Sequence, residues 1–136
     1  MDAALLSSIR SICTQGYERY AYQDYDTALR FFYQAWLKLP KPQTEQQEAE
    51  SVLAAIGDTY YRMGKYELAM EALRSALACP QTATRPLVEM RLGQTLLDTA
   101  QEPQAIAHLQ RAYRLGGDNT FENEDPKYKI AIKNFI

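Results

Sequence analysis

One glycine–alanine–alanine pattern occurs three times along the chain, and it restricts the fold more than any other feature. In each copy an alanine follows the glycine after 12 residues and a second alanine follows 7 residues later. A pattern repeated at this interval indicates a stack of small units with a shared core, because one such unit cannot bury its apolar face alone. The three sets are Gly16, Ala28 and Ala35; Gly57, Ala69 and Ala76; and Gly93, Ala105 and Ala112.

Each unit has the pattern of two helices joined by a tight turn. In the second unit Leu53, Ile56 and Tyr60 recur at three- and four-residue steps, which is the period of an amphipathic helix. Gly64 interrupts this pattern, and a second apolar run begins at Leu68. Alternating strand patterns are absent, so the sequence predicts an all-α chain.

Proline, glycine and capping residues predict where several helices begin and end. Pro86 and Pro103 suit the first turns of the two helices in the third unit, and Gly116-Gly117 suits the end of the second of these helices. Pro80 ends the second helix of the middle unit. The run Thr44-Glu45-Gln46-Gln47 fits a capping box, which predicts an early start for the next helix.

The small residues have an expected packing role at the helix crossings. Gly or Ala leaves room for a neighbouring backbone where two helices approach closely. We therefore expect the repeated glycine of each unit to face the first alanine of that unit. Phe32, Leu73 and Leu109, four residues after those alanines, are then expected to fill the gap to the next unit.

Composition narrows the class of protein. The chain has 136 residues, enough for one domain, and its 15 Lys+Arg against 17 Asp+Glu do not favour a charge-driven nucleic-acid binder. No apolar run approaches the roughly 18 residues needed to span a bilayer, and the N-terminus lacks the basic segment of a secretory signal. Cys13 and Cys79 make no disulfide framework, which predicts a reducing, cytoplasmic setting.

The residue inventory does not favour catalysis. His108 is the one histidine, and its surroundings predict a solvent-facing position on a helix. The stretch Gly57–Lys65 has the wrong glycine spacing for a phosphate loop, and the acidic stretch Asp118–Asp125 lacks the glycine of a calcium-binding turn. We therefore expect no enzyme activity, no catalytic residue, no metal and no cofactor.

These units resemble the tetratricopeptide repeat (TPR) family. That family has apolar, small or aromatic residues at eight positions of a 34-residue unit. Six of the eight agree in the first unit, seven in the second and six in the third. The departures are Gln15, Arg19, Gln81, Glu89 and Gly117.

The resemblance implies a right-handed α-solenoid of three helix-turn-helix repeats with a concave groove. A last helix with an apolar stripe is expected to cap the exposed end of the stack. Met1–Ser8 continues the apolar pattern and is expected to lengthen the first helix. The expected boundaries within this single domain are repeats at about 9–42, 45–83 and 86–117, a linker at 118–124 and a C-terminal helix at 125–136.

In TPR proteins the first helix of each pair lines the groove, and the resemblance carries those positions onto this chain. Tyrosine and arginine suit recognition because they combine large contact area with directional hydrogen bonds. Cys13 also falls on this surface and is expected to be a small packing residue. The candidate peptide-binding residues are Arg10, Tyr17, Tyr20, Asp58, Tyr61, Arg62, Arg91 and Gln94.

One known TPR specificity is disfavoured by inspection. Co-chaperone TPR domains hold a C-terminal carboxylate with five cationic or amide side chains. The same positions here are Cys13, Tyr17, Ala55, Leu87 and Arg91, so one of five agrees. Without the other four donors, most of the charge-assisted hydrogen bonding of such a clamp is lost.

The sequence therefore predicts a non-catalytic adaptor or scaffold that binds a peptide segment of a partner protein in the groove. It predicts no nucleic-acid or membrane partner, and a monomer or weak homo-oligomer. Two alternatives stay open. One is a small bacterial TPR chaperone of the type III secretion kind, although only eight residues, Met1–Ser8, precede the first repeat. The other is a self-assembling scaffold in which the last helix docks onto another copy.

Overall fold

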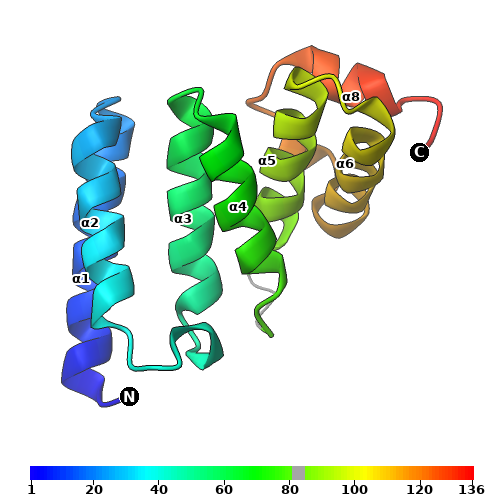
Figure 1. The fold of residues 1–136 in the computed structure, drawn as a ribbon. Coiled ribbons are helices and arrows are strands. Elements are labelled where there is room, and N and C mark those ends of the chain that lie inside the picture. Colours follow the sequence, from blue (N-terminus) through cyan, green and yellow to red (C-terminus); the bar gives the residue numbers. More distant parts are fainter. Residues whose placement is uncertain (81–84) are drawn as a thin grey trace.

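The computed structural model describes residues 1–80 and 85–136, and every regular element in these ranges is helical (Figure 1). Three antiparallel helix pairs stand side by side, followed by two short helices at the C-terminal end. The pairs are α1 (Ala3–Ala21) with α2 (Tyr25–Lys38), α3 (Ala49–Arg62) with α4 (Tyr66–Leu77), and α5 (Arg85–Asp98) with α6 (Glu102–Gly116). The shorter elements are the 3₁₀ turn η1 (Gln43–Glu45), α7 (Asp118–Phe121) and α8 (Pro126–Ile132).

The pairs are stacked as the repeat pattern predicts. The strongest packing lies within each pair, α2 packs on α3, α4 packs on α5, and α3 also packs on α5. The all-helical repeat fold is therefore confirmed. The expected end of the second repeat, and the family position held by Gln81, lie outside the described residues.

The repeated glycines mark three equivalent close approaches, but their nearest neighbours differ from those expected. A Cβ atom added at Gly57 would lie 2.6 Å from Leu73 Cγ, and one added at Gly93 would lie 2.6 Å from Leu109 Cγ. At Gly16 the corresponding atom is Cε1 of Phe32, also at 2.6 Å. The expectation that the glycines face the alanines was wrong. The large residue one turn later lies nearest to each glycine, while the alanines are fully buried.

The start of α3 also differs from the prediction. The helix begins at Ala49, and Glu48 at its N-cap makes no side-chain capping bond. Gln46 is extended, with φ −79° and ψ 148°, so the proposed capping box at 44–47 is wrong. Instead Gln43 donates a 2.7 Å hydrogen bond from Nε2 to the carbonyl of Trp36, which ties η1 to the end of α2.

The C-terminal region packs as a cap over the third pair. Tyr128 and Ile132 of α8 are 3% and 0% exposed and join a cluster with Met90 and Leu109. The stretch expected to be a linker contains α7, whose Phe121 is also buried. The helix expected over 125–136 is shorter and ends at residue 132.

His108 does not face solvent as predicted. Its Nδ1 lies 2.6 Å from Oε2 of Glu89, a buried carboxylate that also pairs with Nε of Arg111 at 3.3 Å. Burial raises the pKa of Glu89, but His108 and Arg111 outweigh that effect and the pKa is lowered. Glu89 stands at a family position that is normally apolar, and these two partners on α6 explain how a carboxylate is accommodated there.

Candidate functional site: the inner face

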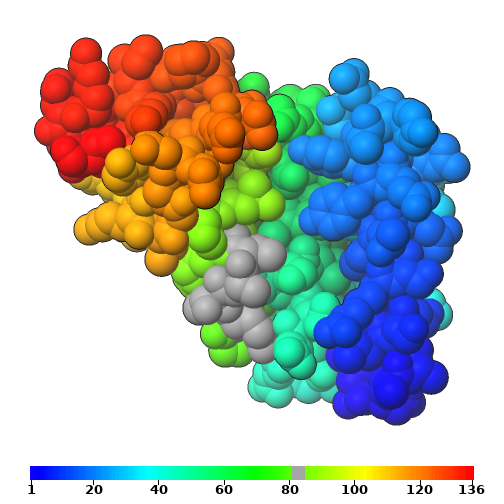
Figure 2. Space-filling view, turned by 180° about the vertical axis from the view of Figure 1, so that it is seen from behind, coloured from blue at the N-terminus to red at the C-terminus, as the bar shows by residue number. Residues whose placement is uncertain are grey.

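Tyr20, Asp58 and Arg91 connect α1, α3 and α5 through hydrogen bonds, and the side of these helices on which they lie is here called the inner face. All eight predicted groove residues belong to these three helices, and three of them, Asp58, Arg91 and Gln94, are buried. Figure 2 shows α1 in blue on one side and the C-terminal segment in orange to red on the other, with α3 between them. The predicted residues divide into two groups. The connected group is Tyr20, Asp58, Tyr61, Arg62, Arg91 and Gln94, and within it Arg62 is also exposed. Arg10 and Tyr17 are exposed and lie outside the connected group.

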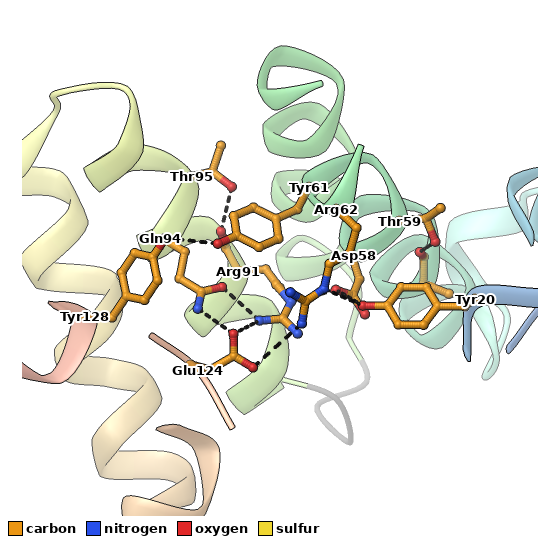
Figure 3. Close-up of polar contacts among 11 residues, drawn as sticks. Tyr20, Asp58, Thr59, Tyr61, Arg62, Arg91, Gln94, Thr95, Glu124 and Tyr128 are labelled. Carbon is orange, nitrogen blue, oxygen red and sulfur yellow. Dashed lines mark hydrogen bonds and ion pairs between the residues drawn. The ribbon is translucent and has the colours of Figure 1, made fainter. Parts of the chain in front are cut away.

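Arg91 is the centre of the connected group (Figure 3). Its Nε donates to Oδ1 of Asp58 at 2.6 Å, and its Nη1 donates to Oε1 of Gln94 at 2.8 Å and to Oε1 of Glu124 at 2.7 Å. Both Arg91 and Asp58 are 5% exposed. Burial disfavours the charged guanidinium, but Asp58 and Glu124 outweigh that cost and raise the pKa of Arg91. Arg91 therefore stays charged in the interior.

Tyr20 links the first repeat to this network. Its hydroxyl donates to Oδ1 of Asp58 at 3.0 Å and accepts from Nε of Arg62 at 2.9 Å. Burial and the nearby charge of Asp58 raise the pKa of Tyr20. The side chain is half-buried and its hydrogen bonds are used within the chain, so it positions its neighbours and offers a ligand mainly its ring.

Tyr61 connects the inner face to the C-terminal cap. Its ring lies under the guanidinium of Arg91, with 5.4 Å from Cζ to the ring centroid. Its hydroxyl is 3.0 Å from that of Tyr128, which donates to Oδ2 of Asp98 at 2.7 Å. Burial, together with Tyr61 and Asp98, raises the pKa of Tyr128. This chain of contacts fixes the α8 end of the cap against α3 and α5.

The α1 side of the inner face is the more accessible part. Tyr17 is 44% exposed, and its ring packs edge-on against Phe32 with 4.9 Å between centroids. Arg10 is exposed and pairs with Glu48 at 3.2 Å from Nη2 to Oε1. The side chain of Arg62, which is 37% exposed, lies between α1 and the C-terminal cap. An aromatic ring and two cations therefore remain available to a ligand.

Sequence reasoning missed three members of the site. Glu124 and Tyr128 come from the C-terminal segment, and Glu48 precedes α3. Glu124 lies in the acidic stretch at 118–125, and the sequence predicts a linker at 118–124. The excess of carboxylates there is the one available signal, and it does not say which of them turns inward.

Cys13 lies at the edge of the inner face and gives a direct test of its burial. Burial, assisted by the charge of Glu48, raises the pKa of the Cys13 thiol to about 11. The thiolate is the reactive form, so we expect iodoacetamide to modify Cys13 about a hundredfold more slowly than an ordinary thiol at pH 8. Mass spectrometry of the modified peptides measures this rate. A modification rate in the folded protein equal to the rate in denaturant would contradict the burial of Cys13.

Residues 1–80 and 85–136 contain no group of three or more His, Cys, Asp or Glu side chains arranged to hold a metal ion. In the same part of the chain, no helix combines the length and the apolar character needed to cross a bilayer.

Comparison with solved structures identifies the fold. The Yersinia enterocolitica type III secretion chaperone SycD, in complex with a peptide of the translocator YopD, matches with a TM-score of 0.73 and 14% identity, covering 94% of this chain and 92% of that one. SycD in an alternative dimer matches with a TM-score of 0.66 and 15% identity, covering 94% and 86%. The chain has a TPR-like helical repeat fold.

Sequence comparison adds less. No protein-family model matches the chain. A Tonsoku-like protein of Danio rerio is 27% identical over 90 residues, which is 62% of this chain. This chain spans only 6% of the length of that relative.

Proposed function

We propose that this chain is a three-repeat TPR module that binds a segment of a partner protein on its inner face, as a non-catalytic adaptor in the cytoplasm. The observation that carries the proposal is the arrangement of Tyr17 and Arg62. Tyr17 is 44% exposed and Arg62 partly exposed. They lie on α1 and α3, and they are linked through Tyr20, whose ring centroid is 6.2 Å from that of Tyr17 and whose hydroxyl accepts a hydrogen bond from Nε of Arg62.

The physical argument is preorganisation. The buried contacts among Tyr20, Asp58 and Arg91 hold α1, α3 and α5 in fixed relative positions. A ligand therefore meets side chains that are already ordered, which lowers the entropy lost on binding. The SycD structure, in which a chaperone with the same fold holds a translocator peptide, supports this use of the fold.

Paired capture from a lysate of the native host tests the proposal. The variant Tyr17→Ala/Arg62→Ala removes the exposed ring and cation and leaves the Arg91–Asp58 pair intact. We expect this variant to lose at least about tenfold of the captured partner, as is typical when aromatic and arginine anchors are removed. Tyr22→Ala is the matched control, since Tyr22 is 82% exposed at the end of α1. Equal capture by all three proteins would reject the inner face as the binding site.

A chaperone of secreted translocators is the second candidate function. The similarity to SycD, which extends over 94% of this chain, favours it. Co-expression tests it: a translocator-like protein encoded in the same host should accumulate in soluble form only with the intact chain. The self-assembling scaffold is less favoured, because Tyr128 and Ile132 of α8 are buried in their own chain. We accordingly propose a monomer or weak homo-oligomer.

A further inference from the structure

Glu124 reaches the inner face from the loop between α7 and α8 rather than from α1, α3 or α5. We propose that this loop, Glu122–Asp125, is an internal competitor: Glu124 fills a carboxylate site in the free protein, and the partner segment carries an acidic side chain that replaces it. This inference rests on the proposed function of the inner face and adds the chemistry of the partner.

The contacts of Glu124 define the site. Its Oε1 accepts from Nη1 of Arg91 at 2.7 Å and from Nε2 of Gln94 at 2.8 Å, and its Oε2 lies 3.9 Å from Nη2 of Arg62 (Figure 3). The three residues that contact Glu124, two by hydrogen bonds and Arg62 by an ion pair, belong to α3 and α5, which also line the inner face. Burial raises the pKa of the Glu124 carboxyl, but Arg91, Gln94 and Arg62 outweigh it and lower the pKa. The loop thus presents a single ionised carboxylate to a preformed set of donors.

Charge balance determines what can replace it. Two guanidinium groups, Arg62 and Arg91, face two carboxylates, Asp58 and Glu124. When Glu124 leaves, one positive charge is in excess beside a nearly buried arginine, which is unfavourable without a new anion. A neutral or basic segment leaves that charge uncompensated. An Asp or Glu side chain restores it, so the site selects an acidic segment.

The loop is able to open without unfolding the cap. Its residues Glu122, Asn123 and Asp125 are exposed, whereas Tyr128 and Ile132 anchor α8 in the second apolar cluster. The N–H of Lys127 donates to Oδ1 of Asp125 at 2.9 Å, which preserves the start of α8. Movement of the loop therefore removes the Glu124 contacts while the helix that follows stays packed.

An internal competitor also sets a threshold for binding. A carboxylate tethered to its own site acts at a local concentration on the millimolar scale. A free acidic side chain alone does not displace it. A partner segment does so when the same segment also contacts the exposed ring of Tyr17, so the acidic side chain and the Tyr17 contact are required together.

Arginine Nε–Hε NMR signals of the ¹⁵N-labelled full chain test the proposal. The probe is the acetylated, amidated peptide Asn-Thr-Phe-Glu-Asn-Glu-Asp, which copies residues 119–125. We expect Glu124→Gln to bind it at least about tenfold more tightly than the wild type, since the charged internal competitor is gone. Glu122→Gln is the matched control, with the same charge change at an exposed neighbour. We expect it to behave as the wild type does.

Two altered peptides identify the group that binds. A peptide with Gln in place of the second Glu should not shift the Arg91 signal. The same Gln peptide with a free carboxyl terminus shows whether the site binds a side-chain carboxylate or the C-terminal carboxylate of a chain. Equal affinity of Glu124→Gln and wild type, or binding of either Gln peptide as tightly as the Glu peptide, would overturn the proposal.

A second variant keeps the proposal testable if Glu124→Gln fails to fold. Glu124→Asp keeps the charge but shortens the side chain by one methylene, and its affinity for the peptide should lie between those of the wild type and Glu124→Gln. An affinity equal to the wild type's in both variants would overturn the proposal. Since the probe copies this chain, the result does not depend on any cellular partner. The peptide experiment can fail while Tyr17→Ala/Arg62→Ala still loses the captured partner. That combination would reject the internal competitor and leave the proposed function standing.

Discussion

Replacing Arg91 with alanine is expected to lower the free energy of unfolding by about 3–5 kcal/mol, because it leaves buried carboxylates without their partner. Asp58 is 5% exposed and accepts its shortest hydrogen bond from Arg91. Glu124 and Gln94 lose their contacts with Arg91 in the same substitution. Urea denaturation followed by circular dichroism measures the change. Arg62→Ala is the control: the Arg62 side chain is 37% exposed, and the substitution should lower the free energy of unfolding by less than about 1 kcal/mol.

The loss should depend on pH in a defined direction. The pKa of Glu124 is lowered in the folded protein, so its favourable contribution is present above the unfolded pKa of about 4.3 and is lost as pH falls through the folded value. The difference between wild type and Arg91→Ala should therefore be full at pH 7 and shrink below about pH 4. A difference that stays constant down to pH 3 would show that the carboxylates are not the source of the effect.

Leu73→Ala is expected to cost about 2–5 kcal/mol, the range for deleting a buried leucine side chain. Leu73 is 0% exposed and lies against Gly57 at the crossing of α3 and α4. Gly57→Ala alone is expected to cost about 1–3 kcal/mol, because its new Cβ would lie 2.6 Å from Leu73 Cγ. Leu68→Ala on the same helix is the control, since Leu68 is 43% exposed. It should change stability by less than about 1 kcal/mol.

The double variant Gly57→Ala/Leu73→Ala tests the contact itself. Removing the leucine provides the space that the new methyl group needs. The two losses should therefore be less than additive by at least about 0.5 kcal/mol, the size of interaction found for residues in contact. Strict additivity would mean that Gly57 and Leu73 are not the contacting pair.

The fold was predictable because each unit repeats the same close approach of two helices at a glycine. Gly16, Gly57 and Gly93 recur at one position of the pattern, and helix pairs in stacks are the structures that need such spacing. The identity of the residue facing each glycine was not predictable. Spacing along a helix gives the face on which a residue lies, but the choice between Ala69 and its neighbour one turn later depends on how the helices cross.

The site was predictable only where it follows the helical period. Tyr20, Asp58 and Arg91 share one face because each occupies a regular position on its helix. Glu124 belongs to a loop, where no period indicates which side chain turns inward. The prediction that His108 faces solvent was wrong for another reason. Its partner Glu89 occupies a position normally held by an apolar residue, so the pair can be recognised only once the positions of both helices are known.

Site-specific photo-crosslinking tests whether partner segments bind on the inner face. A photoreactive phenylalanine analogue replaces Tyr17 on α1 in one variant and Leu37 on α2 in another; these residues are 44% and 77% exposed. After irradiation in the native host, we expect the variant with the analogue at position 17 to crosslink to a partner and the variant with the analogue at position 37 not to. Sequencing of the crosslinked peptide should then show an acidic residue near the attachment point. Crosslinking from position 37 with none from position 17 would contradict binding on the inner face.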